Sequence, residues 1–388
     1  MRIGIDARFL THPQRGGFKT YTTHLIAALA RIDAANAYVL YTDRPLDAAT
    51  PLPPNFRVTV VPGAAPMVGL AWREQVDLPR AVAHDHLDLL HSPCLTAPLR
   101  RACPSVVTIH DMIWRFPEEF STGARLPLRR RLMAAYYRHL PERAARNAAV
   151  VITVSEAARA AIAEHLTIPA ERIVVTPEGP APHFRVLTDH LAVTAQRVQQ
   201  GLPENYVLAI GSADPRKNMA RLVEAYAALP AHLRAVHHLA IVWTHGYLAQ
   251  EIAAQVAALG VSEQVHFLYT VDDAALAQLY NGAALFVFPS LYEGFGLPPL
   301  EAMACGAPVA AADNSSIPEI VGDAALLFTA KAVAQITQVM HAALADAPLR
   351  ADLRRRGLER VRRFSWDACA AQTLHAYAQA IATATVVV

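Results

Sequence analysis

Short apolar segments rich in valine and isoleucine alternate along the chain with longer stretches in which alanine and leucine recur at helical spacing. Uninterrupted apolar runs are typical of strands that are buried on both faces, and the longer stretches suit crossover helices. Seven strands are expected in the first half: RIGID, AYVLYT, FRVTVV, LDLLHS, SVVTIHD, AVVITVS and RIVVTP. Six are expected in the second half: YVLAIGS, HLAIVWT, VHFLYT, LFVFPS, PVAAAD and AALLF. The pattern predicts an α/β protein with parallel sheets.

The alternation breaks between Pro180 and Pro203, where prolines and then a polar stretch follow the seventh expected strand. A chain of 388 residues also exceeds the size at which a single hydrophobic core keeps growing. We therefore expect two Rossmann-like, doubly wound domains, residues 1–185 and residues 200–365, that face each other across a cleft. A helix at about 366–388 is expected to pack back on the first domain.

Composition narrows the class of protein. Apolar residues make up 53% of the chain and charged residues 18%, a balance typical of a folded globular protein. A formal net charge of +2 gives no reason to expect nucleic acid as a partner. The amino terminus lacks a signal-peptide pattern, and no apolar run is long enough to cross a membrane. Four scattered cysteines indicate neither a zinc site nor disulfide bonds and suit the reducing cytoplasm.

One candidate for chemistry is the segment EGFGLPPLE, in which Glu293 precedes a glycine and proline turn and Glu301 lies just inside the following helix. Both carboxylates can accept hydrogen bonds from the hydroxyl groups of a bound sugar or ribose. Free amides at Gly296, Leu297 and Leu300 would meet an anion at the start of that helix. The alternative is a structural turn in which Glu301 stabilises its own helix.

A second loop, IGSADPRKNMARL, places Arg216 and Lys217 directly before another helix. Asp214 and Pro215 form a turn there, and Asn218 can cap the helix. Two cations beside a helix N-terminus suit a diphosphate, whose charges then need no metal. A solvated basic pair on a turn is the alternative. The chain has no D-x-D motif to indicate a metal-bound diphosphate and no G-x-G-x-x-G motif to indicate a nicotinamide or flavin enzyme.

Together these motifs resemble the family 4, or group 1, glycosyltransferases, which are retaining enzymes of the two-domain GT-B fold. PRKN, followed by EGFGLPPLEAMACGAPV with two glutamates separated by seven residues, matches the signature of that family. The resemblance extends through SSIPEIVGDAALLF, IGIDAR, WREQVDLP, VVTIHD and TVSEAA over nearly the whole chain. Within the family, the sequence is most similar to bacterial mannosyl- and glucosyltransferases of surface-polysaccharide assembly.

The resemblance implies a role for individual residues. Arg216 and Lys217 would hold the diphosphate of the donor. Glu293 would contact hydroxyl groups of the transferred sugar, and Glu301 would contact the nucleotide ribose. His110 would stabilise the oxocarbenium-like centre through a hydrogen bond or its carbonyl, although a histidine satisfied locally at a strand end is the alternative. The remaining binding positions that the resemblance implies are Gly16, Gly17, Phe295, Gly296 and Leu297.

The implied activity is that of a metal-independent, retaining hexosyltransferase that acts on a glycan or lipid-linked acceptor. Mannose is favoured as the transferred sugar and glucose comes next, so GDP-mannose is the favoured donor and UDP- and ADP-sugars are alternatives. Two rival functions stay open. A nucleotide-sugar epimerase of the same fold would need no acceptor, and a non-catalytic subunit would bind the sugar nucleotide and leave it intact.

Three segments depart from the family pattern. Trp243 and Thr244 stand where the family often has glycine near the nucleotide, which leaves the identity of the base open. PEGPAP replaces the usual Asn-Gly-Val-Asp, so neither Glu178 nor Gly179 is assigned a ligand role. Lys19 follows the glycine pair and either adds a phosphate contact or lies on the surface.

Two further features have simple structural explanations. Ser155 follows a strand and is expected to cap a helix. Arg125 to Arg146 contains seven arginines against one acid, Glu142. An exposed helix is the commoner explanation of such a stretch, and peripheral contact with an anionic membrane is the alternative.

Overall fold

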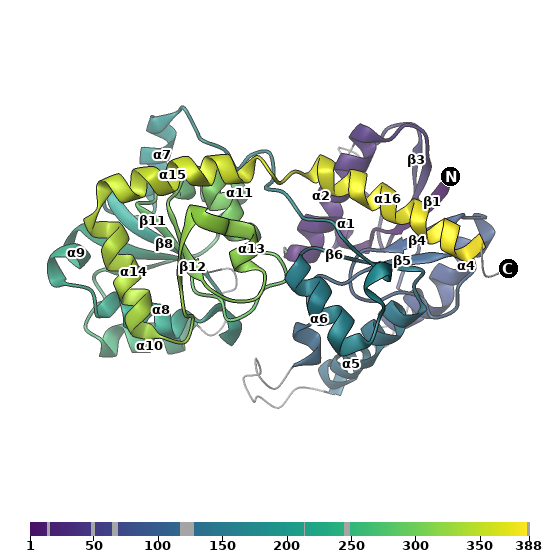
Figure 1. The fold of residues 1–388 in the computed structure, drawn as a ribbon, viewed down its shortest axis with the longest axis horizontal. Helices are drawn as coiled ribbons and strands as arrows, with labels where there is room; N and C mark the ends of the chain where they lie inside the picture. The colour runs from purple at the N-terminus through teal and green to yellow at the C-terminus, as the bar shows by residue number, and fades with distance from the viewer. Residues whose placement is uncertain are drawn as a thin grey trace. The chain divides into compact units, whose positions relative to one another are not determined.

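The computed structural model divides into two compact units, each built around one parallel sheet (Figure 1). Unit 1 comprises the described residues of Met1–Pro117, Gly123–Glu178 and Ser365–Val388, and unit 2 comprises those of Gly179–Phe364. The structure describes residues 1–13, 16–47, 51–63, 69–116, 128–212, 214–243 and 249–385.

Unit 1 contains a seven-stranded parallel sheet in the order β3-β2-β1-β4-β5-β6-β7. Its strands are β1 (Arg2–Asp6), β2 (Ala37–Thr42), β3 (Phe56–Val60), β4 (Leu89–Ser92), β5 (Ser105–Thr108), β6 (Val150–Thr153) and β7 (Ile173–Val175). All seven coincide with the predicted apolar segments. The strand order reverses between β1 and β4, and ligands of such sheets bind beyond the carboxyl ends of the strands near this reversal.

The helices of unit 1 include one from the far end of the chain. They are α1 (Arg8–Thr11), α2 (Gly17–Ile32), α3 (Gly69–Trp72), α4 (Leu78–His84), α5 (Leu128–Asn147), α6 (Glu156–Leu166) and α16 (Trp366–Thr385), with a π-helical turn, Arg73–Asp77, between α3 and α4. Helix α16 packs on α2 and on strands β4 to β7. The Tyr377 hydroxyl of α16 lies 2.7 Å from His91 Nδ1 of β4, which joins the helix to the sheet.

Unit 2 contains a six-stranded parallel sheet in the order β10-β9-β8-β11-β12-β13. Its strands are β8 (Asn205–Gly211), β9 (His237–Trp243), β10 (Val265–Leu268), β11 (Leu285–Phe288), β12 (Val309–Ala312) and β13 (Ala325–Phe328), and again each one was predicted. Its helices are α7 (His190–Gln199), α8 (Met219–Ala227), α9 (Ala231–Val236), α10 (Ala249–Ala258), α11 (Asp273–Gly282), α12 (Leu297–Ala304), α13 (Ile317–Val321), α14 (Val333–Ala345) and α15 (Ala347–Val361).

Strand β8 shows why the sheet of unit 2 is covered on both faces. Successive side chains of a strand point to opposite faces. Val207 and Ala209 belong to one buried cluster, together with side chains of α8 and α14. Tyr206 and Leu208 belong to another, together with side chains of α11 and α12. The sheet is therefore doubly wound, as the sequence predicted.

The structure bears on three local predictions: the helix cap at Ser155, the exposed arginine-rich helix and the lack of a membrane span. Ser155 caps α6 as expected, because its Oγ accepts a hydrogen bond of 3.1 Å from the Ala158 amide. Residues 125–127 of the arginine-rich stretch lie outside the described residues, and within α5 the described Arg138 and Arg143 are exposed. Across the described ranges, every helix is too short or too polar to cross a bilayer.

Candidate active site

The turn that carries the two predicted cations lies between β8 and α8. It is a single 3₁₀ turn, Pro215–Lys217, and it is followed by Asn218 at φ 58°, in the left-handed region that asparagine tolerates. Asn218 occupies the cap position of α8, but its side chain does not cap the helix. Instead its amide donates to the carbonyl oxygens of Pro289 at 3.0 Å and Ala330 at 2.8 Å. The turn is thereby fixed to the loops that follow β11 and β13.

Glu293 lies between the two cations. Lys217 Nζ is 2.7 Å from its Oε1, and the Arg216 guanidinium is 2.7 Å from its Oε2. Ser290 Oγ donates a further hydrogen bond of 2.6 Å to Oε1. Burial raises the pKa of Glu293, but the charges of Lys217 and Arg216 outweigh burial and lower the pKa to about 2. The carboxylate is therefore ionised at neutral pH.

Both cations have N–H donors in addition to those that contact Glu293. Arg216 also pairs with Asp214 at 3.2 Å and donates to the carbonyl of Tyr292 at 2.7 Å. Lys217 has three N–H donors, and the structure shows one of them on Glu293. The side chains of Arg216 and Lys217 are 13% and 17% exposed, so a ligand that reaches them meets charges with little surrounding water. Such charges stabilise a bound anion more than exposed ones do.

The turn after Glu293 is held by the segment SSIPE. Ser316 Oγ donates to the carbonyl oxygens of Phe295 at 2.6 Å and Glu293 at 3.0 Å. Gly296 adopts φ 119°, and a Cβ at this position would lie 2.8 Å from Ile317 Cδ1. Only glycine fits there without strain. The turn that ends in α12 is therefore a rigid part of the loop.

Helix α12 begins at Leu297 with fewer free amides than expected. The Leu300 amide donates to the Gly296 carbonyl at 3.5 Å, the outer limit of a hydrogen bond, so the expectation that this amide is free is wrong. The amides of Gly296 and Leu297 remain as candidate donors. The Phe295 side chain is buried and its ring packs edge-on against Phe364 at 5.9 Å, so only the backbone of Phe295 can meet a ligand.

Glu301 lies on α12 beside a tyrosine of the neighbouring helix. Burial and then the Glu301 charge raise the pKa of Tyr280, and the same two causes raise the pKa of the Cys305 thiol to about 12. The structure thus brings Arg216, Lys217 and Glu293 into contact and places Glu301 next to Tyr280.

His110 lies two residues beyond the carboxyl end of β5 in unit 1 and is 8% exposed. Its Nε2 is 3.0 Å from the Pro93 carbonyl oxygen, and its Nδ1 is 3.4 Å from the Glu178 carboxylate. The rings of Phe18 and Tyr21 pack against the imidazole at 5.3 Å and 4.6 Å between centroids. These four contacts, all from residues of unit 1, hold the imidazole in place.

The partners of His110 favour the doubly protonated ring. A neutral imidazole has one N–H donor, whereas both nitrogens of His110 face an acceptor. Burial lowers the pKa of His110, but hydrogen bonds and charges of Cys94 and Glu178 outweigh burial and raise the pKa to about 10. The raised pKa favours a protonated His110 at neutral pH, with the Glu178 carboxylate beside it.

Sequence reasoning missed Glu178, which is 5% exposed and so fully inside unit 1. Glu178 follows β7 and His110 follows β5, and the carboxyl ends of parallel strands share one edge of a sheet. Glu178 directly follows the expected strand RIVVTP, but nothing in the sequence spacing indicates that it contacts His110.

Gly16 and Gly17 lie at the start of α2. Gly16 has an extended backbone, and a Cβ at either position would meet no atom of the described residues within 4 Å. The fold itself therefore does not require glycine there, which is the pattern expected where a ligand approaches the backbone. Lys19 donates a hydrogen bond of 2.7 Å to the His12 carbonyl.

Trp243 and Thr244 depart from the family pattern after β9 in unit 2. The Trp243 side chain is buried and packs against Phe267, and Thr244 lies outside the described residues.

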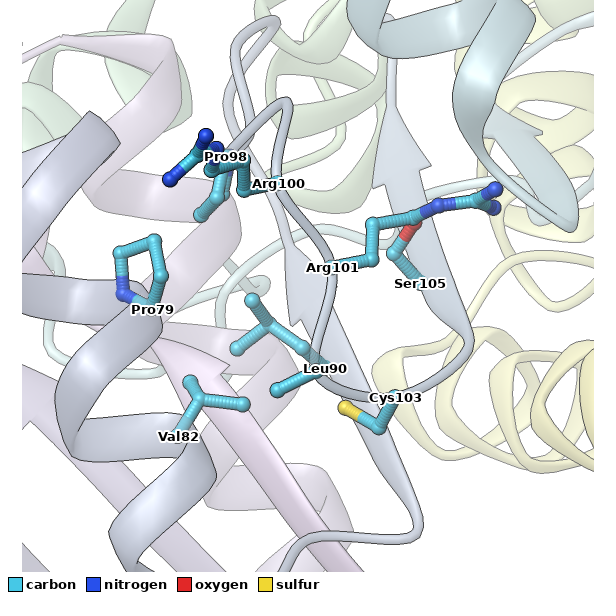
Figure 2. A pocket seen from close by; sticks show the side chains of 9 residues that line it. Pro79, Val82, Leu90, Pro98, Arg100, Arg101, Cys103 and Ser105 are labelled. Carbon is cyan, nitrogen blue, oxygen red and sulfur yellow. The ribbon is translucent and has the colours of Figure 1, made fainter.

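Figure 2 shows a small hollow of unit 1 lined by Val82, Leu90 and Cys103. Its volume is about 10 Å³, which is room for roughly one water molecule. It is too small for a sugar. Among the residues that the structure describes, no group of three or more His, Cys, Asp or Glu side chains is arranged to hold a metal ion.

Comparison with known proteins shows the class to which this fold and site belong. Residues 193–360 match the family model described as glycosyl transferases group 1, and residues 15–181 match glycosyltransferase family 4. The chain belongs to the group 1, family 4 glycosyltransferases. It is 32% identical over 310 residues to the MMP α-(1→4)-mannosyltransferase of Mycolicibacterium hassiacum, covering 76% of this chain and 71% of that protein.

A second relative bears on the family, and one solved structure bears on the fold. The O-antigen chain mannosyltransferase B of Escherichia coli is 37% identical over 241 residues, and the match covers 60% of this chain and 61% of that protein. The chain thus matches about three fifths of the length of that relative. Sucrose-phosphate synthase from Thermosynechococcus elongatus superposes with a TM-score of 0.74 at 23% identity, covering 98% of each chain. The predicted GT-B architecture, as two doubly wound α/β units, is confirmed.

Proposed function

We propose that this chain is a retaining hexosyltransferase that moves mannose, or next glucose, from a nucleoside-diphosphate sugar to a glycan or lipid-linked acceptor. The observation that carries the proposal is the convergence of Arg216 and Lys217 on Glu293, between the starts of helices α8 and α12. Two poorly solvated cations beside helix N-termini suit a diphosphate, and a carboxylate between them suits the hydroxyl groups of the attached sugar.

Catalysis by this site would be mainly electrostatic. When the glycosidic bond breaks, its electron pair leaves with the diphosphate, and Arg216 and Lys217 stabilise that growing charge more than they stabilise the intact donor. The amides of Gly296 and Leu297 would add to this effect. The acceptor hydroxyl attacks from the face that the diphosphate leaves, and a phosphate oxygen takes its proton. No protein base or metal is needed in this scheme.

The remaining candidate residues position the donor. Glu293 would accept hydrogen bonds from sugar hydroxyls, Glu301 would accept them from the ribose, and the exposed backbone of Gly16 and Gly17 would approach the phosphates. We assign the contact with the sugar to the His110 carbonyl, because both ring nitrogens of His110 already face acceptors within unit 1.

The donor is tested by thermal unfolding with GDP-mannose, UDP-glucose and ADP-glucose. GDP-mannose is favoured, since two relatives that match more than half of the chain are named mannosyltransferases. A ligand present at about 100 times its dissociation constant should add about 2.7 kcal/mol to the unfolding free energy. We expect this increase with GDP-mannose; an increase with UDP-glucose or ADP-glucose alone would change the assigned base.

Product analysis by mass spectrometry separates the proposal from its rivals. Incubation with donor and a mannose-containing oligosaccharide should lengthen the oligosaccharide by one hexose. Free nucleotide with an altered sugar and no lengthened oligosaccharide would indicate an epimerase. An intact donor would indicate a binding subunit. We also propose that the reaction takes place in the cytoplasm, which suits the four cysteines that form no disulfide bond. We further propose that α5 contacts an anionic membrane from that side.

A further inference from the structure

A second concave site lies in unit 1 beyond the carboxyl ends of β1, β2 and β3. Phe9 follows β1, Asp43 follows β2 and Gly63 follows β3, and all three line one cavity of about 420 Å³. Pockets for small organic ligands usually measure about 300–1,000 Å³. The cavity, called here the arginine pocket after three arginines in its lining, is therefore large enough for a sugar ring.

The innermost arginine of this pocket is Arg73, which is 1% exposed. Its Nε donates to the Val61 carbonyl at 2.8 Å, and one terminal nitrogen donates to the Tyr41 carbonyl at 3.0 Å and pairs with Asp6 at 2.9 Å. Within the described part of the chain, the other terminal nitrogen has no hydrogen-bond partner. Arg73 begins the π-helical turn Arg73–Asp77, and such turns occur often at functional sites. A buried donor of this kind indicates a ligand or a bound water.

The charges of the pocket are balanced. Arg8 pairs with Asp6 at 3.2 Å and with the buried Glu74, and Arg44 lies 3.8 Å from Asp43. Each of the three arginines therefore has a carboxylate partner, but only Asp43 lines the cavity, because Asp6 and Glu74 are buried outside its lining. An anion would have to compete with these carboxylates, whereas a neutral ligand with hydroxyl groups can donate to Asp43 and accept from the guanidinium groups. The balance favours a neutral, hydroxyl-rich ligand.

Aromatic rings complete the lining. Phe9 and Tyr137 both border the cavity. The apolar C–H face of a sugar ring packs well on the electron-rich face of such rings. The Phe9 ring is also 5.3 Å from the Phe18 ring, which is 5.3 Å from the imidazole of His110. A continuous row of rings therefore leads from the pocket to the residue assigned to the transferred sugar.

We propose that the arginine pocket binds a neutral saccharide unit of the acceptor. This inference rests on the proposed function, because it identifies the chemical class of the molecule that receives the hexose. It also gives a role to the segment WREQVDLP, from which Arg73 and Glu74 come.

The test compares two variants of one short helix in the full-length chain. Leu70 of α3 lines the pocket, so Leu70→Trp should fill it. Trp72→Leu is the matched control, since Trp72 lies on the same helix, is 50% exposed and is not part of the pocket lining. Phe9→Leu is a second variant that removes the ring but keeps an apolar side chain. Binding of methyl α-D-mannopyranoside, methyl β-D-glucopyranoside and mannose 6-phosphate is measured by saturation-transfer NMR, and binding of GDP and UDP by calorimetry.

We expect the wild type to bind at least one neutral glycoside, and Leu70→Trp and Phe9→Leu to raise its dissociation constant by about tenfold or more. Trp72→Leu should bind as the wild type does, and the affinity for nucleotide should be the same in all four proteins. The inference is overturned if the wild type binds neither glycoside, if Leu70→Trp binds as the wild type does, or if mannose 6-phosphate binds more tightly than both neutral sugars. Failure of the proposed function looks different, because then neither nucleotide binds and no hexose is transferred.

Discussion

At the scale of single residues, the contact between Lys217, Arg216 and Glu293 is the arrangement from which the chemistry follows. A pair of cations on a turn could have been a solvated surface feature, yet the structure packs both of them, partly buried, against one carboxylate. The resemblance to the family implied that these residues serve one donor, and the structure shows that the strands before their loops, β8 and β11, are neighbours in the sheet. The sequence did not predict the ion pairs, which depend on side-chain positions that no spacing determines.

Replacement of Lys217 by methionine tests this arrangement. Lys217→Met keeps the length of the side chain and removes the charge that would stabilise the leaving diphosphate. We expect kcat to fall by about 10²- to 10³-fold, with a much smaller loss of affinity for the nucleoside diphosphate. Steady-state kinetics and calorimetry provide the two values. The exposed Lys331, also in unit 2, gives the control Lys331→Met, which should behave as the wild type. Small and equal effects on kcat and affinity would remove Lys217 from the mechanism.

The pair of His110 and Glu178 makes a prediction about pH. The pKa of His110 is raised from 6.5 to about 10, so the stability that the pair contributes is fully present below pH 6.5 and is lost as the pH rises through about 10. Glu178→Gln should bring the His110 pKa back toward 6.5 and reduce this loss. NMR titration of the imidazole C–H signal, assigned with His110→Gln, measures the pKa directly.

The control for that titration is Glu164→Gln, at an exposed glutamate of α6 in the same unit. It should leave the His110 signal unchanged. A His110 signal that titrates near 6.5 in the wild type would show that the ring is neutral and that Glu178 does not act as its counterion. Glu178 itself could not be predicted as a partner, because β5 and β7 are separated by β6 and their loops meet only in the folded sheet.

At the scale of elements, the prediction from sequence was most accurate for the strands. All thirteen coincide with predicted segments, and the reason is clearest for central strands such as β5, β6 and β11, which are buried along their whole length and so carry few polar residues. The cap of α6 was equally local, since Ser155 bonds an amide only three residues away. The π-helical turn Arg73–Asp77 was not foreseen. It depends on long-range hydrogen bonds from Arg73 to the carbonyls of Tyr41 and Val61. Helix propensity describes single residues and cannot predict such contacts.

Helix α16 provides the prediction at this scale. Tyr377→Phe removes the hydroxyl that bonds His91 Nδ1 and leaves a buried polar nitrogen without that partner. The expected cost is about 1–3 kcal/mol of unfolding free energy, measured by urea denaturation. Tyr269 is 48% exposed, so Tyr269→Phe is a matched control that should change stability by less than about 0.5 kcal/mol. If Tyr377→Phe is as stable as the wild type, that hydrogen bond does not secure α16 to the sheet.

At the scale of the whole molecule, both units follow one rule of construction. In unit 1 the glycine pair and His110 follow β1 and β5, and in unit 2 the cations and Glu293 follow β8 and β11. Each group therefore lies beyond the carboxyl ends of parallel strands, where ligands of doubly wound sheets bind. The sequence predicted these locations from the loops that follow the expected strands and from the resemblance to the family. It did not reveal the arginine pocket, whose lining combines residues from five separate segments of unit 1.

The return of the chain in α16 has a consequence for biosynthesis. Among the described residues, unit 2 comes from the one stretch Gly179–Phe364, whereas unit 1 includes contacts such as Arg31 with Asp367, which are 336 residues apart. A ribosome therefore releases every residue of unit 2 before it supplies the last helix of unit 1. We infer that the domain translated second is the first to complete its native core, and that the domain translated first waits, with the surface beneath α16 uncovered, until synthesis is nearly finished.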